Sequence, residues 1–215
     1  MPASRARAAS PTTSHLRGID QRFRAPGRGG GPLWQFLRGF LKHPVMVGSI
    51  IPSSKTLIDA MLAPVEWSNT RLFVEYGPGV GTFSRHILDR LPHDATLITI
   101  DTNPDFTKYL KRAIRDPRLL AVTGSAADVG RIIADRGFAH ADFILSGLPF
   151  STLPGGVGPR IAAETAAALR PGGAFLVYQF SPKVRTYIAP HFERIDSGFE
   201  WRNIPPATLF WAWKR

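Results

Sequence analysis

From about residue 71 onward, short apolar runs alternate with segments whose apolar residues recur at helical spacing. The apolar runs predict strands at about 71–76, 95–101, 118–123, 141–146 and 173–180. The segments between them predict helices at about 82–91, 104–115, 126–136 and 159–169. Two further strand-like runs, at about 191–201 and 207–214, follow without a long helix between them. This alternation predicts an α/β fold with a doubly wound sheet of seven strands that closes in an antiparallel hairpin.

The first 63 residues follow a different pattern. Residues 1–32 have almost nothing apolar to bury, which predicts a disordered tail. Residues 33–43 place Trp and Phe on one side of a short helix and cations on the other; this suits an anionic membrane surface, or equally packing on the core. Ser53 or Ser54 is predicted to cap a second helix. We therefore expect a tail at 1–32, N-terminal helices at 33–63 and an α/β domain at 64–215.

The chain is strongly basic, and its positive charge is concentrated near the N-terminus. The 215-residue chain has a net charge of +11, and residues 1–45 carry eight Lys and Arg against Asp20 alone. Such a field attracts an anionic lipid surface or nucleic acid without distinguishing them, and a merely solvated tail is the plain alternative. The sequence has no cysteine and no paired histidines, so no disulfide, thiolate nucleophile or catalytic metal site is expected. No apolar run approaches the roughly 18 residues of a spanning helix.

The strongest candidate for chemistry is the turn Glu75-Tyr76-Gly77-Pro78-Gly79-Val80-Gly81, which joins the first strand to a helix. Open α/β sheets bind ligands at the carboxyl ends of their strands, and glycines there let the backbone approach a ligand closely. The next strand ends in Asp101, in the position from which a carboxylate accepts hydrogen bonds from ribose. The pattern predicts a nucleoside cofactor; the alternative is that Asp101 only caps the following helix.

Four features together favour S-adenosylmethionine over a dinucleotide. They are Glu75 before the first glycine, Gly124-Ser125-Ala126 after the third strand, Ser146-Gly147-Leu148-Pro149-Phe150 after the fourth, and the closing hairpin. With them, residues 44–215 resemble the class I S-adenosylmethionine-dependent methyltransferases, which have a Rossmann-like sheet. The resemblance implies that the 77–81 turn and Glu75 hold the methionine part, Asp101 the ribose, and Ser125 with Ala126 the adenine.

Within that superfamily the chain is similar to the bacterial phospholipid N-methyltransferases. The similar segments are Phe36-Leu37 with Pro44, Gly48-Ser49-Ile50-Ile51-Pro52-Ser53-Ser54, the Glu75 turn, Ser146-Gly147-Leu148-Pro149 and Trp201-Arg202-Asn203-Ile204-Pro205-Pro206-Ala207. Members methylate the amine of phosphatidylethanolamine towards phosphatidylcholine, related enzymes act on ornithine lipids, and an N-terminal amphipathic helix binds them to the membrane. The resemblance implies a monomeric enzyme, peripheral on the cytoplasmic face of the membrane, that releases S-adenosylhomocysteine.

The candidate site residues follow from these patterns. Cofactor binding is assigned to Ser53, Glu75, Tyr76, Gly77, Pro78, Gly79, Gly81, Asp101, Thr102, Ser125, Ala126 and Ser146. Methyl transfer from a sulfonium to nitrogen depends on positioning a neutral amine, so no dedicated base is assigned. Ser146, Gly147, Leu148 and Pro149 are the catalytic candidates, whose backbone carbonyls would accept hydrogen bonds from the amine. Methylated, cationic intermediates would contact the aromatic rings of Phe150, Tyr178, Phe180 and Trp201. The headgroup phosphate would bind the cations Lys183, Arg185 and Arg202.

Other functions remain open on the sequence. The segment 146–150 is also similar to the Asn-Leu-Pro-Tyr type loop of rRNA adenine N6-dimethyltransferases, and the charge suits RNA. Such enzymes carry a helical domain after the sheet, whereas this sequence stops at the final strand. An ornithine-lipid N-methyltransferase is another alternative. A binding module with an inactive cofactor pocket is a third, against which the intact glycines and Asp101 argue.

Overall fold

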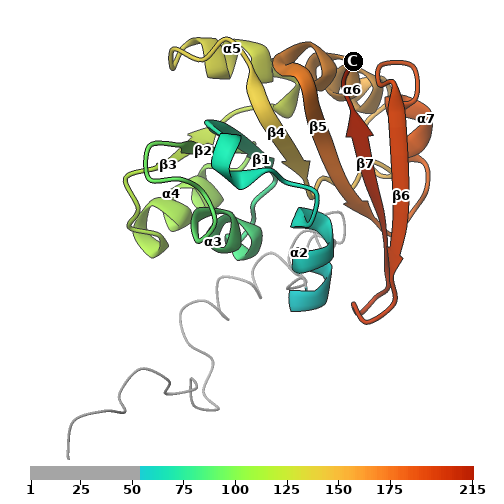
Figure 1. Cartoon of the computed structure of the whole chain (residues 1–215), viewed down its shortest axis with the longest axis horizontal. Helices are drawn as coiled ribbons and strands as arrows, with labels where there is room; N and C mark the ends of the chain where they lie inside the picture. Colours follow the sequence, from blue (N-terminus) through green and yellow to red (C-terminus); the bar gives the residue numbers. More distant parts are fainter. Residues whose placement is uncertain (1–53) are drawn as a thin grey trace, which may run out of the picture.

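A computed structural model describes residues 54–215 as one seven-stranded sheet with helices on both faces (Figure 1). The strands are β1 (Leu72–Tyr76), β2 (Thr96–Asp101), β3 (Leu119–Thr123), β4 (Ala141–Ser146), β5 (Leu169–Gln179), β6 (Arg194–Glu200) and β7 (Ala207–Trp213). Their order across the sheet is β3-β2-β1-β4-β5-β7-β6. The first five strands pair in parallel, and β7 runs antiparallel to both β5 and β6. The predicted α/β fold class and closing hairpin are therefore confirmed.

Two layers of helices cover the sheet. One face carries α2 (Lys55–Leu62), α3 (Thr82–Leu88) and α4 (Pro104–Ala113), and the other carries η3 (Ala126–Asp128), α5 (Val129–Ala134), α6 (Val157–Ala168) and α7 (Val184–Ile188). A short 3-10 turn, η2 (Trp67–Asn69), precedes β1. Within β1, Phe73 faces the first layer while Val74 faces the second. Because both faces are buried, the central strands read as continuous apolar runs in the sequence.

The observed elements differ most clearly from the predicted ones in two helical segments and one strand. The helix predicted at 126–136 is split into η3 and α5, because the hydroxyl of Ser125 accepts the Ala127 N–H and starts a tighter turn. Helix α7 was not predicted, since its five residues are too few to show periodicity. Strand β5 begins at Leu169 rather than at 173, and a shift in its pairing with β4 accommodates the irregular stretch.

Helix α2 is the first element of the described part of the chain. Its cap is Ser54, whose Oγ accepts a hydrogen bond from Leu57 N at 3.2 Å. The buried side chains of α2 form the stripe that its spacing indicates. The predicted tail at 1–32, the predicted helix at 33–43 and Ser53 lie outside the described residues. Within residues 54–215, no helix combines the length and apolarity needed to cross a bilayer.

A buried carboxylate joins three strands at the amino edge of the sheet. Asp142, on β4, accepts hydrogen bonds at Oδ2 from Arg71 N (2.7 Å) and Leu72 N (2.9 Å), where β1 begins. Its Oδ1 accepts a hydrogen bond from Arg170 Nε at 2.5 Å, near the start of β5. A carboxylate removed from water is costly unless donors replace the lost solvent, and three donors do so here. This edge lies opposite the strand ends that carry the candidate site.

Candidate functional site

The sheet reverses its winding between β1 and β4, which is where open α/β sheets bind ligands. A glycine follows β1, β3 and β4 at this edge and donates its N–H to the neighbouring strand. Gly77 bonds to Ile100 O (2.9 Å), Gly147 to Tyr76 O (3.1 Å) and Gly124 to Asp101 O (2.9 Å). The structure therefore brings together the predicted glycine turn, Asp101 and the 146–150 loop.

The glycine turn has a backbone that other residues adopt only under strain. Gly77, Gly79 and Gly81 have φ values of +61°, +55° and +79°. A Cβ on Gly81 would lie 2.6 Å from Leu110 Cδ2, and one on Gly77 would lie 3.0 Å from Leu148 Cδ2. These two glycines are thus also needed for packing within the protein, Gly81 against α4 and Gly77 against the 146–150 loop.

Asp101 stands half-buried at the end of β2. Its Oδ1 accepts a hydrogen bond from Asn103 N at 2.8 Å. Asn103 is the residue that caps α4, since its own Oδ1 accepts the Asp105 N–H at 2.9 Å. The alternative that Asp101 merely caps this helix is therefore wrong. Burial raises the pKa of Asp101 to about 6, so hydroxyl donors from a bound sugar would restore hydrogen bonds that the carboxylate has lost.

Glu75 does not project from the turn towards open space. The side chain is only 3% exposed, and its Oε2 accepts a hydrogen bond from Ser84 Oγ of α3 at 2.5 Å. Burial, and secondarily the charge of Asp101, raises the pKa of Glu75 to about 7. Glu75 is thus a largely buried carboxyl group whose Oε2 is engaged by Ser84, and its contact with the amino group of a cofactor stays a prediction.

This raised pKa predicts a pH-dependent stability. In the unfolded chain Glu75 ionises near its ordinary value of 4.5, whereas the folded protein keeps the proton until about pH 7. Stability that is fully present below pH 4.5 is therefore lost as the pH rises to about 7, by about 3 kcal/mol. We expect Glu75→Gln to flatten the fall in the free energy of unfolding, measured by urea denaturation at pH 5, 6, 7 and 8. Substitution of the exposed Glu66 by Gln is the control, and equal slopes in both variants would contradict the assignment.

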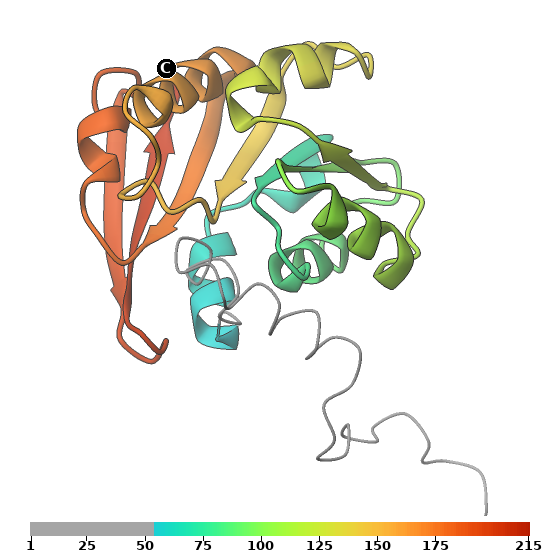
Figure 2. The same cartoon turned by 180° about the vertical axis from the view of Figure 1, so that it is seen from behind.

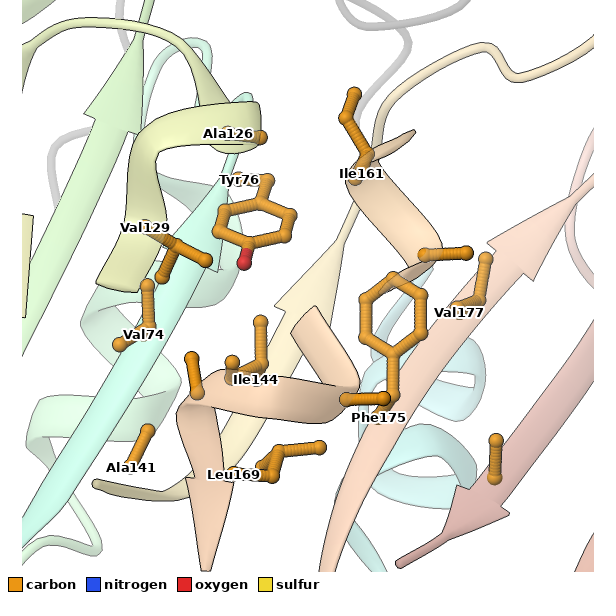
Figure 3. Close-up of a cluster of buried hydrophobic side chains, with 14 of the residues drawn as sticks. Val74, Tyr76, Ala126, Val129, Ala141, Ile144, Ile161, Leu169, Phe175 and Val177 are labelled. Carbon is orange, nitrogen blue, oxygen red and sulfur yellow. The ribbon is translucent and has the colours of Figure 1, made fainter. Parts of the chain in front are cut away.

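The side chain of Tyr76 lies away from the strand-end edge. Figure 3 shows its ring in the buried cluster with Val129 and Ile144, and its hydroxyl is 3.1 Å from Thr165 Oγ1. Its carbonyl oxygen is used by Gly147 N. The prediction that Tyr76 contacts the cofactor is therefore wrong for the side chain, which is part of the core.

Two carbonyl groups of the 146–150 loop accept hydrogen bonds from the protein itself. Leu148 O accepts Phe150 N (2.9 Å) and Gln179 Nε2 (2.6 Å), and Pro149 O accepts the backbone and hydroxyl of Thr152. Ser146 is fully buried, and its Oγ accepts Leu148 N at 3.2 Å. Among the described residues, no donor reaches Gly147 O. The carbonyl groups of Leu148 and Pro149 are therefore engaged within the protein, which favours the Gly147 carbonyl among the predicted acceptors; its contact with an amine stays a prediction.

Tyr178 lies directly across Gly147. Its ring stacks on Phe83 of α3, with centroids 5.0 Å apart. A Cβ on Gly147 would collide with the Tyr178 hydroxyl and lie 3.1 Å from Cζ. The next residue, Gln179, was not among the predicted site residues, although its amide holds the loop at Leu148 O. A polar residue at the end of an apolar strand was the signal that could have indicated it.

The remaining predicted residues fall into three places. Phe150 is buried, with its ring 6.4 Å from that of Phe175, so its assignment to the substrate mouth is wrong. Lys183 and Arg185 are exposed at the start of α7. This helix packs beside the sheet and is distant from the turn of the β6–β7 hairpin (Figure 2). Exposed Phe180, Trp201 and Arg202 follow the ends of β5 and β6, at the same edge as the glycine turn.

The predicted adenine-binding segment follows β3. Ser125 is half-buried and its hydroxyl is engaged by Ala127 N, while Ala126 is buried. Thr102 is exposed beside Asp101, and Pro78 is buried in the glycine turn. Contact of these residues with a cofactor stays a prediction.

Sequence comparison relates the chain to methyltransferases. No family model matches the sequence. An ornithine lipid N-methyltransferase of Singulisphaera acidiphila is 32% identical over 179 residues, which cover 82% of this chain and 93% of that protein. A putative O-methyltransferase of Mycobacterium sp. (strain JLS) is 27% identical over 138 residues, which cover 61% of this chain and 57% of that protein.

Solved structures share the fold. Precorrin-6y C5,15-methyltransferase of Geobacter metallireducens matches with a TM-score of 0.62 at 11% identity, covering 77% of this chain and 92% of that one. An O-methyltransferase of Bacillus cereus in complex with SAH matches with a TM-score of 0.58 at 15% identity, covering 85% and 90%. At these identities the likeness concerns the fold, and it agrees with the strand order described above.

Proposed function

Because the chain belongs to the family of bacterial lipid N-methyltransferases, within the class I S-adenosylmethionine-dependent superfamily, we propose that it methylates the amine of an ornithine lipid. The observation that carries the proposal is the 32% identity that extends over 93% of an ornithine lipid N-methyltransferase. Phosphatidylethanolamine, the acceptor expected from the sequence, presents a primary amine of the same kind. It is therefore the first competitor to test.

The residues at the strand-end edge fit S-adenosylmethionine as the methyl donor. When bound, this cofactor supplies an electrophilic methyl group on a sulfonium. The positive-φ turn at Gly77, Gly79 and Gly81 presents backbone without side chains, which suits close approach to a ligand. Asp101 would hold the ribose hydroxyl groups, since its carboxylate sits at the end of the adjacent strand with a pKa raised by burial.

The acceptor amine must lose a proton before it can attack. A primary amine of the lysine type has a pKa near 10, and partial desolvation beside a cationic cofactor lowers that value. The Gly147 carbonyl would accept a hydrogen bond from the amine and leave its lone pair free for the methyl group. The ring of Tyr178, next to Gly147, would stabilise the cationic product through its face.

We also propose that the protein acts at the membrane surface on the cytoplasmic side, as a monomer. The support is the charge of residues 1–45 and the apolar stripe at 33–43, both taken from the sequence. Sedimentation of the full-length protein with vesicles containing phosphatidylglycerol tests the location. Protein that stays in the supernatant at low salt would count against it.

The acceptor can be identified with a labelled methyl donor. We expect the full-length protein to transfer label to ornithine lipid in mixed micelles, faster than to phosphatidylethanolamine and without labelling ribosomal RNA. Preferential labelling of phosphatidylethanolamine would show that this lipid, rather than ornithine lipid, is the acceptor. Label in RNA alone would overturn the proposal. An Asp101→Ala variant, which should label nothing at limiting cofactor, shows that the signal depends on the proposed site.

A further inference from the structure

Four large apolar side chains are exposed together at the end of the β6–β7 hairpin and the adjacent end of β5. They are Phe180 (47% exposed), Phe199 (64%), Trp201 (68%) and Ile204 (84%). Among the described residues, only one other large apolar side chain, Leu120, is exposed, and it lies on β3 at the opposite edge of the sheet. Single exposed apolar residues need no explanation, but a group of this kind indicates an interaction surface. We call these four residues, with Arg202, the hairpin tip.

Hydrogen bonds fix the conformation of the hairpin tip. Asn203, at its centre, is buried; its Oδ1 accepts Ser54 N at 2.9 Å, and its Nδ2 donates to Pro205 O at 2.7 Å. Glu200 Oε1 accepts Arg202 N at 2.7 Å. The turn is thereby fixed while its apolar side chains point outward. A surface that is already ordered loses little conformational entropy when it binds.

The hairpin tip projects on the side of the molecule where the candidate site lies. Figure 1 shows the hairpin extending beyond the ends of β4 and β5, beside α2. The bond from Asn203 to Ser54 also ties the tip to the point where residues 1–53 join the fold. The chain therefore enters the described domain at Ser54, which lies at the same edge as the hairpin tip.

We propose that the hairpin tip inserts into the interfacial layer of a lipid bilayer and brings the strand-end site to the headgroups. The chemistry of the tip fits this occupant, because Trp favours the headgroup level and Ile and Phe the acyl boundary. The guanidinium of Arg202 lies 5.2 Å from the Trp201 ring centroid, which joins a cation for lipid phosphates to an amphipathic ring. The proposal rests on the lipid-directed function proposed above.

Other partners fit the hairpin tip less well. A protein partner needs on the order of 800 Å² on each side, and a narrow projecting turn offers much less. A nucleic acid would need several cations to neutralise phosphates, and the tip has Arg202 alone among residues 199–206. A fluid bilayer accepts a small convex apolar tip without a complementary groove.

The test compares the full-length protein with Phe199→Ser/Ile204→Ser. Neither position belongs to the candidate site, and both side chains are exposed, so the variant is expected to fold. Leu120→Ser, which removes the exposed apolar residue at the far edge, is the matched control. We expect the double variant to partition about tenfold more weakly onto vesicles of phosphatidylcholine and phosphatidylglycerol, and the control to match wild type.

Activity separates this inference from the proposed function. We expect the double variant to methylate lipid in vesicles about tenfold more slowly and to act normally on a short-chain acceptor dispersed as monomers. Unchanged partition onto vesicles would overturn the inference while leaving the proposed function intact. Absence of lipid methylation by the wild-type protein, with tip-dependent vesicle binding, would overturn the function instead. A large fall in thermal stability of the double variant would show that the chain itself covers the tip, which also contradicts the inference.

Discussion

Asp101→Ala is expected to bind S-adenosylhomocysteine at least about a hundredfold more weakly than wild type in isothermal titration. Hydrogen bonds from ligand hydroxyls to a carboxylate contribute roughly 1.5–3 kcal/mol each, and two such bonds would be lost. The substitution should not unfold the protein. Burial raises the pKa of Asp101 to about 6, so the ionised group costs stability at neutral pH rather than supplying it.

The controls for this variant lie on the same stretch of chain. Asp105→Ala removes an exposed carboxylate in the first turn of α4, 4.0 Å from Lys108, and should leave the affinity within about twofold. Asp101→Asn keeps an acceptor for Asn103 N and tests whether the charge itself matters. Wild-type affinity in Asp101→Ala would remove the cofactor assignment.

Gly147→Ala should reduce methyl transfer about a hundredfold and leave the affinity for S-adenosylhomocysteine nearly unchanged. The new Cβ collides with the hydroxyl of Tyr178, whose ring is stacked on Phe83 and cannot move without breaking that stack. Within residues 54–215, no donor reaches the Gly147 carbonyl, which is the acceptor proposed for the amine. Displacing it by about 1 Å misplaces the amine, an error that can lower the rate about a hundredfold.

A double variant shows whether the collision is the cause. Adding Tyr178→Phe to Gly147→Ala removes the oxygen that the Cβ meets, so about a tenth of the wild-type rate should return. Gly130→Ala is the control, because a Cβ there meets nothing within 4 Å. A wild-type rate in Gly147→Ala, measured with labelled cofactor, would exclude Gly147 from the acceptor site.

The sequence predicted the sheet well because its signals are local. Each central strand is an apolar run, Asp101 ends β2 and Gly77 directly follows β1, so the topology alone brings them to one edge. Tyr76 was misassigned because the alternation of side chains continues to the last residue of β1. It shares the face of Val74, which packs in the core.

Other residues depend on contacts that the sequence does not indicate. Phe150 turns into the core because the chain reverses after Pro149, and the ring then meets Phe175 on a different strand. Asn203 lies in a segment that the sequence analysis noted, yet its partner is Ser54, at the other end of the domain. The pairing of β6 with β7 and the position of α2 bring them together. Only the assembled fold makes that contact.

The position of Asp142 affects which substitutions the protein can tolerate during evolution. Its three hydrogen bonds secure β1, β4 and β5 at the edge remote from the glycine turn and the hairpin tip. Substitutions among the loops at the other edge therefore leave this anchor intact. A scaffold built in this way can acquire new acceptors by altering one rim, while the opposite rim preserves the alignment of the strands.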